Sequence, residues 1–190
     1  MNKNDSMVPI KVFRFDPEVD KEPRFETYLV PLEGSVLDAL RYIYENYDAS
    51  LGYRFGCSGA GHQRCGACPV LVNGRPALSC KYLIEKEMTV EAHPKFEVIR
   101  DLVLDFDRER KRDKKIIPNV KITIDPEKCD GCRDCVFICP LKVFEVRKNE
   151  AKMISVPVDS ESCCGLTCEQ CSIFCKNNAI KIEMMMERKT

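Results

Sequence analysis

Two runs within the first thirty residues have patterns typical of strands. Val8, Ile10 and Val12 alternate with polar residues in a run that extends over residues 8–15. Residues 25–30 form a second run rich in β-branched and aromatic side chains. We expect these runs to be two strands that pair as a hairpin.

A helix is predicted directly after this hairpin. Ser35 stands at the expected N-cap, and Asp38 follows three residues later, which is the spacing of a capping box with Asp in place of Glu or Gln. The apolar positions that follow keep the spacing of a helix. They are Val36, Leu37, Leu40, Ile43, Tyr44 and Tyr47.

More strands are predicted between residues 70 and 92. Asn73-Gly74 separates two short apolar runs, and this dipeptide favours the type I′ turn of a tight hairpin because both of its residues tolerate positive φ. Residues 88–92 form a further short strand. Strands gathered around one helix predict an α+β domain of the β-grasp type, which we place at residues 1–104.

Residues 96–115 show helical spacing of their apolar positions, and the end of this stretch is almost wholly charged. The pattern predicts an interdomain helix with a solvated end. We interpret residues 105–118 as a charged linker between two domains, with a docking surface as the alternative interpretation of the charge.

The second half of the chain contains an internal repeat. A strand is predicted at residues 120–124, a hairpin with strands at 143–146 and 153–156, and a last strand at 179–182. In each half of this region, a group of cysteines is followed by a short strand with a similar pattern of apolar residues. The repeat predicts a compact, two-fold ferredoxin-like domain at residues 119–190.

The chain has 190 residues, a net charge of zero and thirteen cysteines. The neutral charge gives no indication of nucleic acid or an anionic membrane as partner. The first fifteen residues lack a secretory pattern, and no run approaches the roughly 18 apolar residues of a spanning helix. We therefore expect a soluble cytoplasmic protein, in which reduced cysteines indicate metal binding rather than disulfides.

The cysteines at 129, 132, 135 and 139 match the bacterial iron–sulfur run C-x2-C-x2-C-x3-C-P. Three thiolates on one loop suit three irons of a cubane, and Gly131 permits close approach of the backbone. The fourth cysteine is expected to bind a neighbouring cluster. A zinc site requires two separated pairs of ligands and is the weaker alternative.

The third group of cysteines repeats this motif with one residue added after its first ligand. By the crossover rule, two [4Fe–4S] ligand sets are expected. The first set is Cys129, Cys132, Cys135 and Cys175, and the second is Cys139, Cys164, Cys168 and Cys171. Cys163 can take the place of Cys164 as ligand, and a [3Fe–4S] cluster is the alternative if neither thiol reaches the fourth iron.

The first group follows another pattern. Its two middle cysteines are close together in the sequence, and its first and last cysteines lie farther away on either side. These are Cys57, Cys65, Cys68 and Cys80. The spacing is close to the plant-type pattern for a [2Fe–2S] cluster, lengthened by three residues in the first loop. Small residues around the ligands leave room for backbone amides to approach sulfide.

Several segments carry a family resemblance. They are Tyr53-Arg54-Phe55-Gly56-Cys57, Cys65-Gly66-Ala67-Cys68, Val72-Asn73-Gly74, Ala77-Leu78-Ser79-Cys80 and Val98-Ile99-Arg100-Asp101-Leu102-Val103. With them the N-terminal half resembles the iron–sulfur subunit of the succinate dehydrogenase and fumarate reductase family, while the C-terminal half resembles a bacterial-type 2[4Fe–4S] ferredoxin. The resemblance implies a flavoprotein (FAD) subunit as partner, docking near the [2Fe–2S] domain.

These observations predict an electron-transfer subunit of a multi-subunit oxidoreductase. It would conduct single electrons between the flavoprotein and another redox partner through one [2Fe–2S] and two [4Fe–4S] clusters, within a hetero-oligomer. We expect no catalytic residue, because the chain shows no glycine-rich phosphate loop after a strand, no Ser/His/Asp order and no carboxylate pair with a clear role. A free-standing ferredoxin shuttle and a zinc-binding interaction module are the alternatives.

Overall fold

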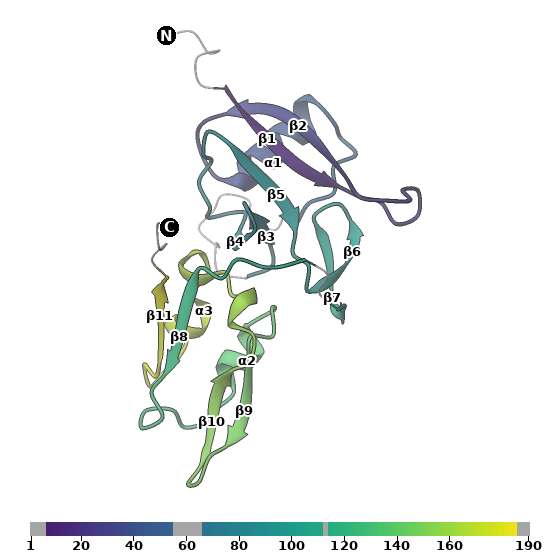
Figure 1. Ribbon diagram of the computed structural model, residues 1–190. Helices are drawn as coiled ribbons and strands as arrows, with labels where there is room; N and C mark the ends of the chain where they lie inside the picture. Colours follow the sequence, from purple (N-terminus) through teal and green to yellow (C-terminus); the bar gives the residue numbers. More distant parts are fainter. Residues whose placement is uncertain (1–6, 55–65, 112–113, 186–190) are drawn as a thin grey trace.

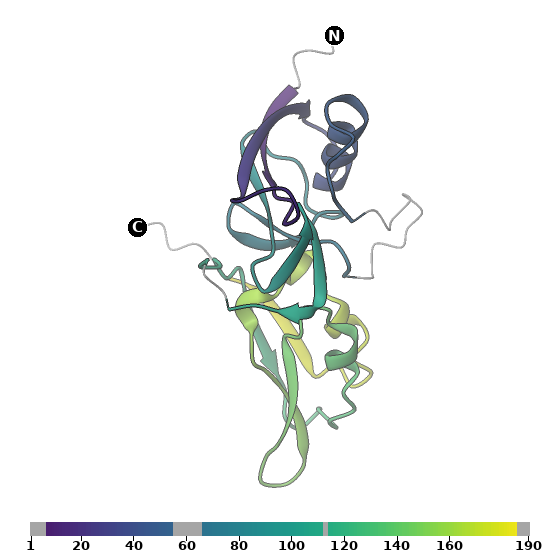
Figure 2. The same cartoon turned by 90° about the vertical axis from the view of Figure 1, so that its right-hand side faces the viewer.

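The computed structural model describes residues 7–54, 66–111 and 114–185. It has two lobes placed end to end, with the N-terminal half of the chain in one and the C-terminal half in the other (Figure 1). A view from the side shows the same elongated arrangement (Figure 2). No helix in these described ranges has the length and apolar content needed to cross a membrane.

The N-terminal lobe is built on a five-stranded sheet with the order β2-β1-β5-β3-β4. β1 and β2 pair antiparallel, which confirms the first predicted hairpin, and β1 pairs parallel with β5. β3 pairs antiparallel with both β4 and β5. The strands are β1 (Met7–Arg14), β2 (Arg24–Pro31), β3 (Pro69–Val72), β4 (Arg75–Leu78) and β5 (Met88–Ala92).

The predicted helix is confirmed as α1 (Val36–Asn46). The Ser35 side chain accepts a hydrogen bond from the Asp38 amide, and the Asp38 carboxylate accepts one from the Ser35 amide at 2.8 Å. This reciprocal capping stabilises a helix start by about 1 kcal/mol. The face of α1 that is buried consists of Val36, Leu37, Ala39, Leu40 and Ile43.

The turn at Asn73-Gly74 also has the predicted geometry. Both residues have positive φ, 51° and 78°, and they connect β3 to β4 in register. The segment that enters the second lobe packs against this hairpin, because the Ile117 amide donates to the Gly74 carbonyl at 3.0 Å and Asn119 Nδ2 donates to the Pro76 carbonyl at 3.0 Å.

The interdomain helix predicted over residues 96–115 is wrong. This stretch forms an antiparallel hairpin of β6 (Phe96–Arg100) and β7 (Val103–Glu109). The buried residues Phe96, Leu102 and Leu104 all have even numbers, as in a strand with one face buried. Several of these positions also fit a helical period, which explains the wrong prediction. The turn is made at Asp101, whose φ is 48°.

A buried polar network holds this turn in place. Arg14 is only 2% exposed, and it donates to Asp101 at 3.1 Å and to Asp48 at 2.5 Å. The Asp101 carboxylate also accepts a hydrogen bond from the Gly52 amide at 2.7 Å. The network therefore joins β1, the end of α1 and the β6–β7 turn to the segment that precedes Cys57.

The C-terminal lobe contains two separate two-stranded sheets. Its strands agree with the prediction from the sequence, and β8 pairs with β11 while β9 pairs with β10. The strands are β8 (Val120–Ile124), β9 (Phe144–Lys148), β10 (Met153–Pro157) and β11 (Ile180–Met184). The helical segments are α2 (Asp134–Ile138), α3 (Gln170–Ile173) and two 3-10 turns at Ser160–Ser162 and Gly165–Thr167.

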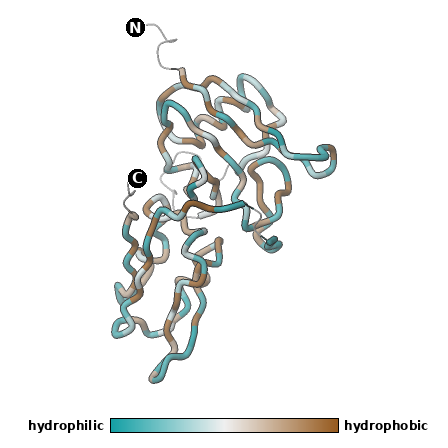
Figure 3. Tube along the Cα trace, viewed as in Figure 1, coloured by the Kyte–Doolittle hydropathy of each residue, from teal (hydrophilic) through white to brown (hydrophobic). Residues whose placement is uncertain are grey.

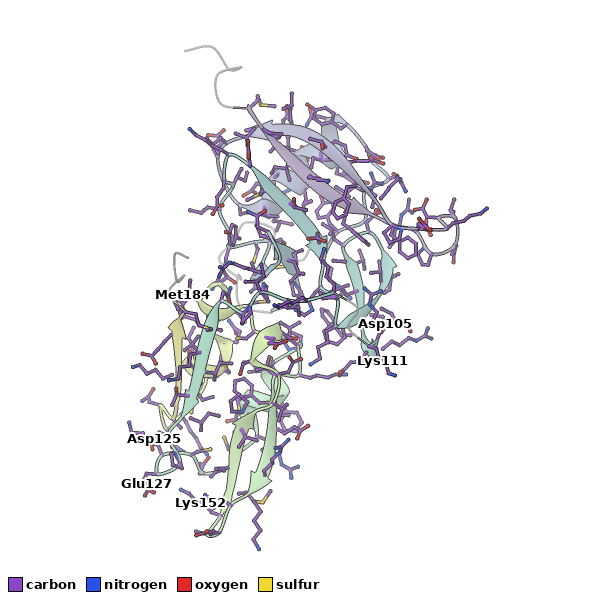
Figure 4. The ribbon with its side chains drawn as sticks, in the orientation of Figure 1. Asp105, Lys111, Asp125, Glu127, Lys152 and Met184 are labelled. Atoms are coloured by element: carbon purple, nitrogen blue, oxygen red, sulfur yellow. The ribbon has the colours of Figure 1, made fainter. Side chains whose placement is uncertain are left out.

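One end of this lobe lies against the N-terminal lobe and the other lies far from it (Figure 4). Asp125, Glu127 and Lys152 lie at the tip far from the N-terminal lobe, where Lys152 Nζ donates to the Glu127 carbonyl at 3.3 Å. Met184, at the end of β11, lies on the side of the lobe that faces the N-terminal half. The β9–β10 hairpin therefore projects away from the junction.

One hydrophobic cluster runs through the junction of the two lobes. It includes Phe96, Leu78 and Cys68 from the N-terminal lobe together with Val143 and Cys164 from the C-terminal lobe. Hydrophobic stretches are visible within both lobes and in the segment that joins them (Figure 3). Burial of this shared apolar surface favours one fixed arrangement of the lobes.

A buried ion pair also crosses the junction. Lys95 and Asp159 are each 8% exposed at the side chain, and Lys95 Nζ lies 2.9 Å from an Asp159 carboxylate oxygen. The same ammonium group donates to the carbonyls of Leu141 at 2.6 Å and Lys142 at 3.3 Å. Lys95 thus ties the N-terminal lobe to the segment after Cys139 and to the segment before Cys163.

Replacing Lys95 by Met is expected to lower the free energy of unfolding by about 3 to 5 kcal/mol, because Asp159 is left buried without this partner. Anaerobic urea unfolding followed by circular dichroism measures the change. The matched control is Lys142→Met, which removes an exposed ion pair with Glu109 (3.0 Å) and should cost at most about 1 kcal/mol. Equal losses in both variants would contradict a structural role of the buried pair.

Candidate metal centres

Eleven of the thirteen cysteines lie in the described residues, and all eleven are free thiols. Cys57 and Cys65 lie outside the described residues. The C-terminal cysteines surround two cavities, which we call the outer and the inner cavity. They lie in different positions relative to the junction of the lobes.

The outer cavity is lined by the four cysteines of the first predicted [4Fe–4S] set. They are Cys129, Cys132, Cys135 and Cys175. α2 and the loop before it carry three of these thiols, and the fourth comes from the turn before β11. Cys132 is exposed to solvent, whereas Cys129 and Cys135 are buried.

Hydrogen bonds hold the thiols of the outer cavity in place. The Ser155 hydroxyl lies 3.0 Å from Cys135 Sγ, and the Ser155 amide donates to Cys129 Sγ at 3.4 Å. The Ala179 amide donates to Cys175 Sγ at 3.3 Å. Gly131 has φ of 71°, and an added Cβ would lie 2.6 Å from a backbone oxygen of β10, so the loop requires glycine.

The inner cavity is lined by the second predicted set together with Cys163, the alternative to Cys164 as ligand. Its cysteines are Cys139, Cys163, Cys164, Cys168 and Cys171. The remaining wall is mostly apolar and includes Gly66 and Leu78 from the N-terminal lobe. Both Cys163 and Cys164 face this cavity, so the structure leaves both candidates for the fourth ligand in reach.

Burial changes the ionisation of the inner thiols. Loss of hydration raises the pKa of Cys163 to about 12, and it raises the pKa of Cys164 and Cys171 well above the ordinary range of a thiol. The Gly165 amide opposes this for Cys163 by donating to its Sγ at 3.3 Å. These thiols are protonated at neutral pH unless a metal replaces the proton.

Two of the four N-terminal candidates, Cys68 and Cys80, lie together at the edge of β3 and β4. Both are buried, and a hydrogen bond from the Cys80 thiol lowers the pKa of Cys68 to about 6. This hydrogen bond favours the thiolate form of Cys68, the form that binds metal. The pair stands directly beside the junction of the lobes.

The donor sets fit iron–sulfur clusters. Four thiols around one cavity are the ligands that [4Fe–4S] clusters take in proteins, and amide donors to sulfur accompany them here. Within the part of the chain that the structure describes, no three His, Cys, Asp or Glu side chains converge as closely as a single bound ion requires. The thiols instead line the two cavities.

Three functional residues were missed from the sequence. Ser155 contacts two thiols of the outer cavity, and Lys95 with Asp159 braces the segments that carry the inner thiols. Serine, lysine and aspartate are common surface residues, so nothing in the linear pattern marks them. Only their contacts and low exposure in the folded chain indicate their role.

Comparison with known proteins identifies the class. The model for the 2Fe-2S iron-sulfur cluster binding domain matches residues 9–111, and the model for the 4Fe-4S binding domain matches residues 121–146. The predicted [2Fe–2S] and [4Fe–4S] domain types are confirmed, and the chain is an iron–sulfur protein. Since the first match covers more than half of its length, the chain belongs to the family of the 2Fe-2S iron-sulfur cluster binding domain.

Curated relatives agree with the resemblance predicted above. The fumarate reductase iron-sulfur subunit of Haemophilus influenzae is 39% identical over 108 residues, covering 54% of this chain and 41% of that protein. A fumarate reductase (CoM/CoB) subunit of Methanothermobacter marburgensis is 27% identical over 203 residues, covering 89% of this chain and 41% of that protein. The chain thus spans about two fifths of the length of these relatives.

Two further similarities were found. An uncharacterized iron-sulfur protein of Methanocaldococcus jannaschii is 32% identical over 153 residues, covering 72% of this chain and 30% of that protein. Among solved structures, a chain of the Mycobacterium smegmatis Sdh1 complex in the apo form is 30% identical, with a TM-score of 0.44, and covers 53% of this chain and 42% of that chain.

Iron is expected to leave the protein faster as the pH falls from about 8.5 to about 6.5, because each ligating thiol takes up a proton when iron departs. Burial raises the pKa of the inner thiols, so protons compete with iron for them more strongly as the pH falls, and iron release becomes faster. The absorbance of an anaerobic ferrous-chelator complex measures the release. A release rate independent of pH would contradict this linkage.

Proposed function

We propose that this chain is the iron–sulfur electron-transfer subunit of an oxidoreductase complex. The proposal rests on where the three groups of cysteines lie in the folded chain. Cys68 and Cys80 stand at the junction, and the two thiol-lined cavities follow in the C-terminal lobe. Metal centres placed in succession through a protein form a path along which electrons are transferred singly.

The proposed ligands follow the three groups of cysteines. Cys57, Cys65, Cys68 and Cys80 would hold a [2Fe–2S] cluster, with the first two outside the described residues. A [4Fe–4S] cluster in the outer cavity would have Cys129, Cys132, Cys135 and Cys175 as ligands. The inner cavity would hold a second cubane through Cys139, Cys168, Cys171 and either Cys163 or Cys164, with a [3Fe–4S] cluster as the alternative.

Bound clusters supply one-electron chemistry, and the chain sets their environment. Backbone amides that donate to Cys129 and Cys175 stabilise negative charge on sulfur and so favour the reduced state. The apolar wall of the inner cavity excludes water and disfavours added negative charge. An amide also donates to a thiol of the inner cavity, from Gly165 to Cys163, so the two cavities differ mainly in their remaining walls. These are mostly apolar in the inner cavity and include Asp130, Arg133 and Asn177 in the outer one.

We propose that the N-terminal lobe is a β-grasp [2Fe–2S] domain and that the C-terminal lobe, from residue 119, is a compact two-fold 2[4Fe–4S] domain. The five-stranded sheet with α1 against it supports the first assignment. The pairing of β8 with β11 and of β9 with β10 supports the second. Since β7 continues to Glu109, the link between the domains begins after that strand.

The proposed partner is a flavoprotein (FAD) subunit, and the similarity to fumarate reductase subunits supports it. A further redox subunit or carrier would complete the path in a cytoplasmic hetero-oligomer. A free-standing ferredoxin is the second candidate, but such shuttles usually present a surface of one charge for rapid encounter. The balanced charge of this chain favours the subunit.

Analysis of anaerobically purified protein is expected to give about ten irons and about ten acid-labile sulfides per chain, from one [2Fe–2S] and two [4Fe–4S] clusters. About nine irons would indicate a three-iron centre. Zinc in place of iron would contradict the proposal.

Replacing Cys68 by Ser is expected to remove the [2Fe–2S] resonance and to leave both cubane resonances, because the cubane ligands lie elsewhere in the chain. Electron paramagnetic resonance of the reduced protein measures this. Cys132→Ser is the matched variant, which should lose one cubane resonance and keep that of the [2Fe–2S] cluster. Loss of every resonance in both variants would contradict separate ligand sets.

Purification of the tagged chain from its native cells is expected to yield a flavoprotein at fixed stoichiometry. Gel filtration with flavin absorbance and mass spectrometry measures this. Elution as a lone chain that reduces several unrelated enzymes would instead favour the shuttle.

A further inference from the structure

The C-terminal lobe consists of two halves that repeat each other in sequence. In the first half, residues 125–131 follow the pattern D-x-E-x-C-x-G. Residues 159–165 of the second half follow the same pattern. The repeat therefore places Cys163 in the position of Cys129, and it places Cys164 in the position of Asp130.

The backbone repeats in the same way. Each of the two segments follows a strand, β8 in the first half and β10 in the second, and each is followed by a short helix, α2 or α3 (Figure 1). The residue that caps the start of each helix has a left-handed conformation, with φ of 72° at Arg133 and 52° at Glu169. The two halves thus correspond in conformation as well as in sequence.

The glycine that ends the pattern occupies equivalent places in the two halves. Gly131 and Gly165 both have positive φ, 71° and 56°. A Cβ on Gly131 would meet the backbone of Met153, the first residue of β10. A Cβ on Gly165 would overlap the side chain of Val120, the first residue of β8. Each glycine lies against the strand that opens the other half, and this reciprocal contact fixes the alignment of the two patterns.

The Cys163 thiol shares the surroundings of the Cys129 thiol. Both cysteines are 8% exposed. Cys163 Sγ accepts a hydrogen bond from the Gly165 amide at 3.3 Å, and Cys129 Sγ accepts one from the Ser155 amide at 3.4 Å. Amide donors of this kind stabilise the negative charge of a thiolate that binds iron. Since Cys129 is a proposed ligand in the outer cavity, Cys163 holds the equivalent position for the inner cavity.

Cys164 differs from Cys163 in what its position requires. Its counterpart Asp130 has no thiol, and it pairs with the exposed Lys176 at 3.1 Å. In the second half the same position is buried in the junction, where Cys164 is 2% exposed within the hydrophobic cluster that joins the lobes. A cysteine without a metal packs there as a small apolar side chain, whereas a carboxylate would lose its hydration.

Two added residues account for the longer cysteine spacing of the second half. In the first half, Cys132 follows the glycine directly, whereas Leu166 and Thr167 separate the glycine from Cys168 in the second. The added residues belong to a 3-10 turn that packs against β4, and Thr167 Oγ1 accepts a hydrogen bond from the Leu78 amide at 3.1 Å. The addition makes contact with the N-terminal lobe, and it leaves the correspondence before the glycine unchanged.

We propose that Cys163, and not Cys164, is the fourth ligand of the centre in the inner cavity, and that Cys164 is a packing residue of the junction. This inference rests on the proposed function and chooses between two residues that it leaves open. Iron takes the place of the proton on the Cys163 thiol, while the Cys164 thiol keeps its proton. The ligands in the inner cavity are then Cys139, Cys163, Cys168 and Cys171.

Matched variants at both positions test this choice in the full, anaerobically purified chain. Cys164→Ala and Cys164→Val are expected to keep about ten irons per chain and an unchanged inner cubane resonance, which is the one lost in Cys171→Ser. Cys163→Ala and Cys163→Val are expected to lose about one to four irons, and the inner resonance should vanish or give way to that of a three-iron centre. Iron analysis and electron paramagnetic resonance measure these changes.

The valine variants separate packing from ligation, because valine fills apolar space but cannot bind iron. Iron that is lost in Cys164→Ala and regained in Cys164→Val would support a packing role. A shifted inner resonance in the Cys163 variants alone would also support the choice, because another group would then have replaced the native ligand.

Loss of iron in both Cys164 variants would overturn the choice, and so would an unchanged inner resonance in both Cys163 variants. Each variant is scored only if it keeps the [2Fe–2S] resonance, which reports a folded chain. Failure of the proposed function is distinguishable, since the original chain would then contain neither iron nor acid-labile sulfide.

Discussion

A buried cysteine has two opposing properties, because its thiol packs well among apolar side chains while a metal ligand must be ionised. At the junction of the two lobes this opposition is strongest, where burial raises the pKa of Cys163 to about 12. A metal held by these thiols, as proposed, would replace their protons. The folded junction and such a cluster would then depend on each other, because metal binding would contribute to the stability of the native state.

The junction is also where the chain combines apolar packing with a specific polar contact. Lys95 reaches across it to Asp159 and to the carbonyls that follow Cys139. A buried pair of this kind adds little net stability compared with apolar side chains, but it disfavours arrangements in which either charge is left alone. It selects one relative position of the two lobes, and with it the spacing of the thiols on either side.

Local patterns predicted most of the secondary structure. The capping box at Ser35 and the Asn73-Gly74 turn were correct, because both depend on hydrogen bonds and φ angles of a few adjacent residues. The stretch at residues 96–115 was wrong, because its apolar positions suit periods of both 2 and 3.6 residues. Tertiary packing decided between them, through the Arg14 contact with Asp101 at the turn.

The sequence by itself determined the chemistry of this protein, since the cysteine spacings specify which thiols can share a loop and hence the type of cluster. It also indicated the crossover of Cys139 and Cys175, which the folded chain places in separate cavities. Only the tertiary structure decided which cavity lies against the N-terminal lobe. That choice depends on contacts such as Gly66 with Pro140 and Leu78 with Thr167, between residues far apart in the chain, and no local pattern encodes them.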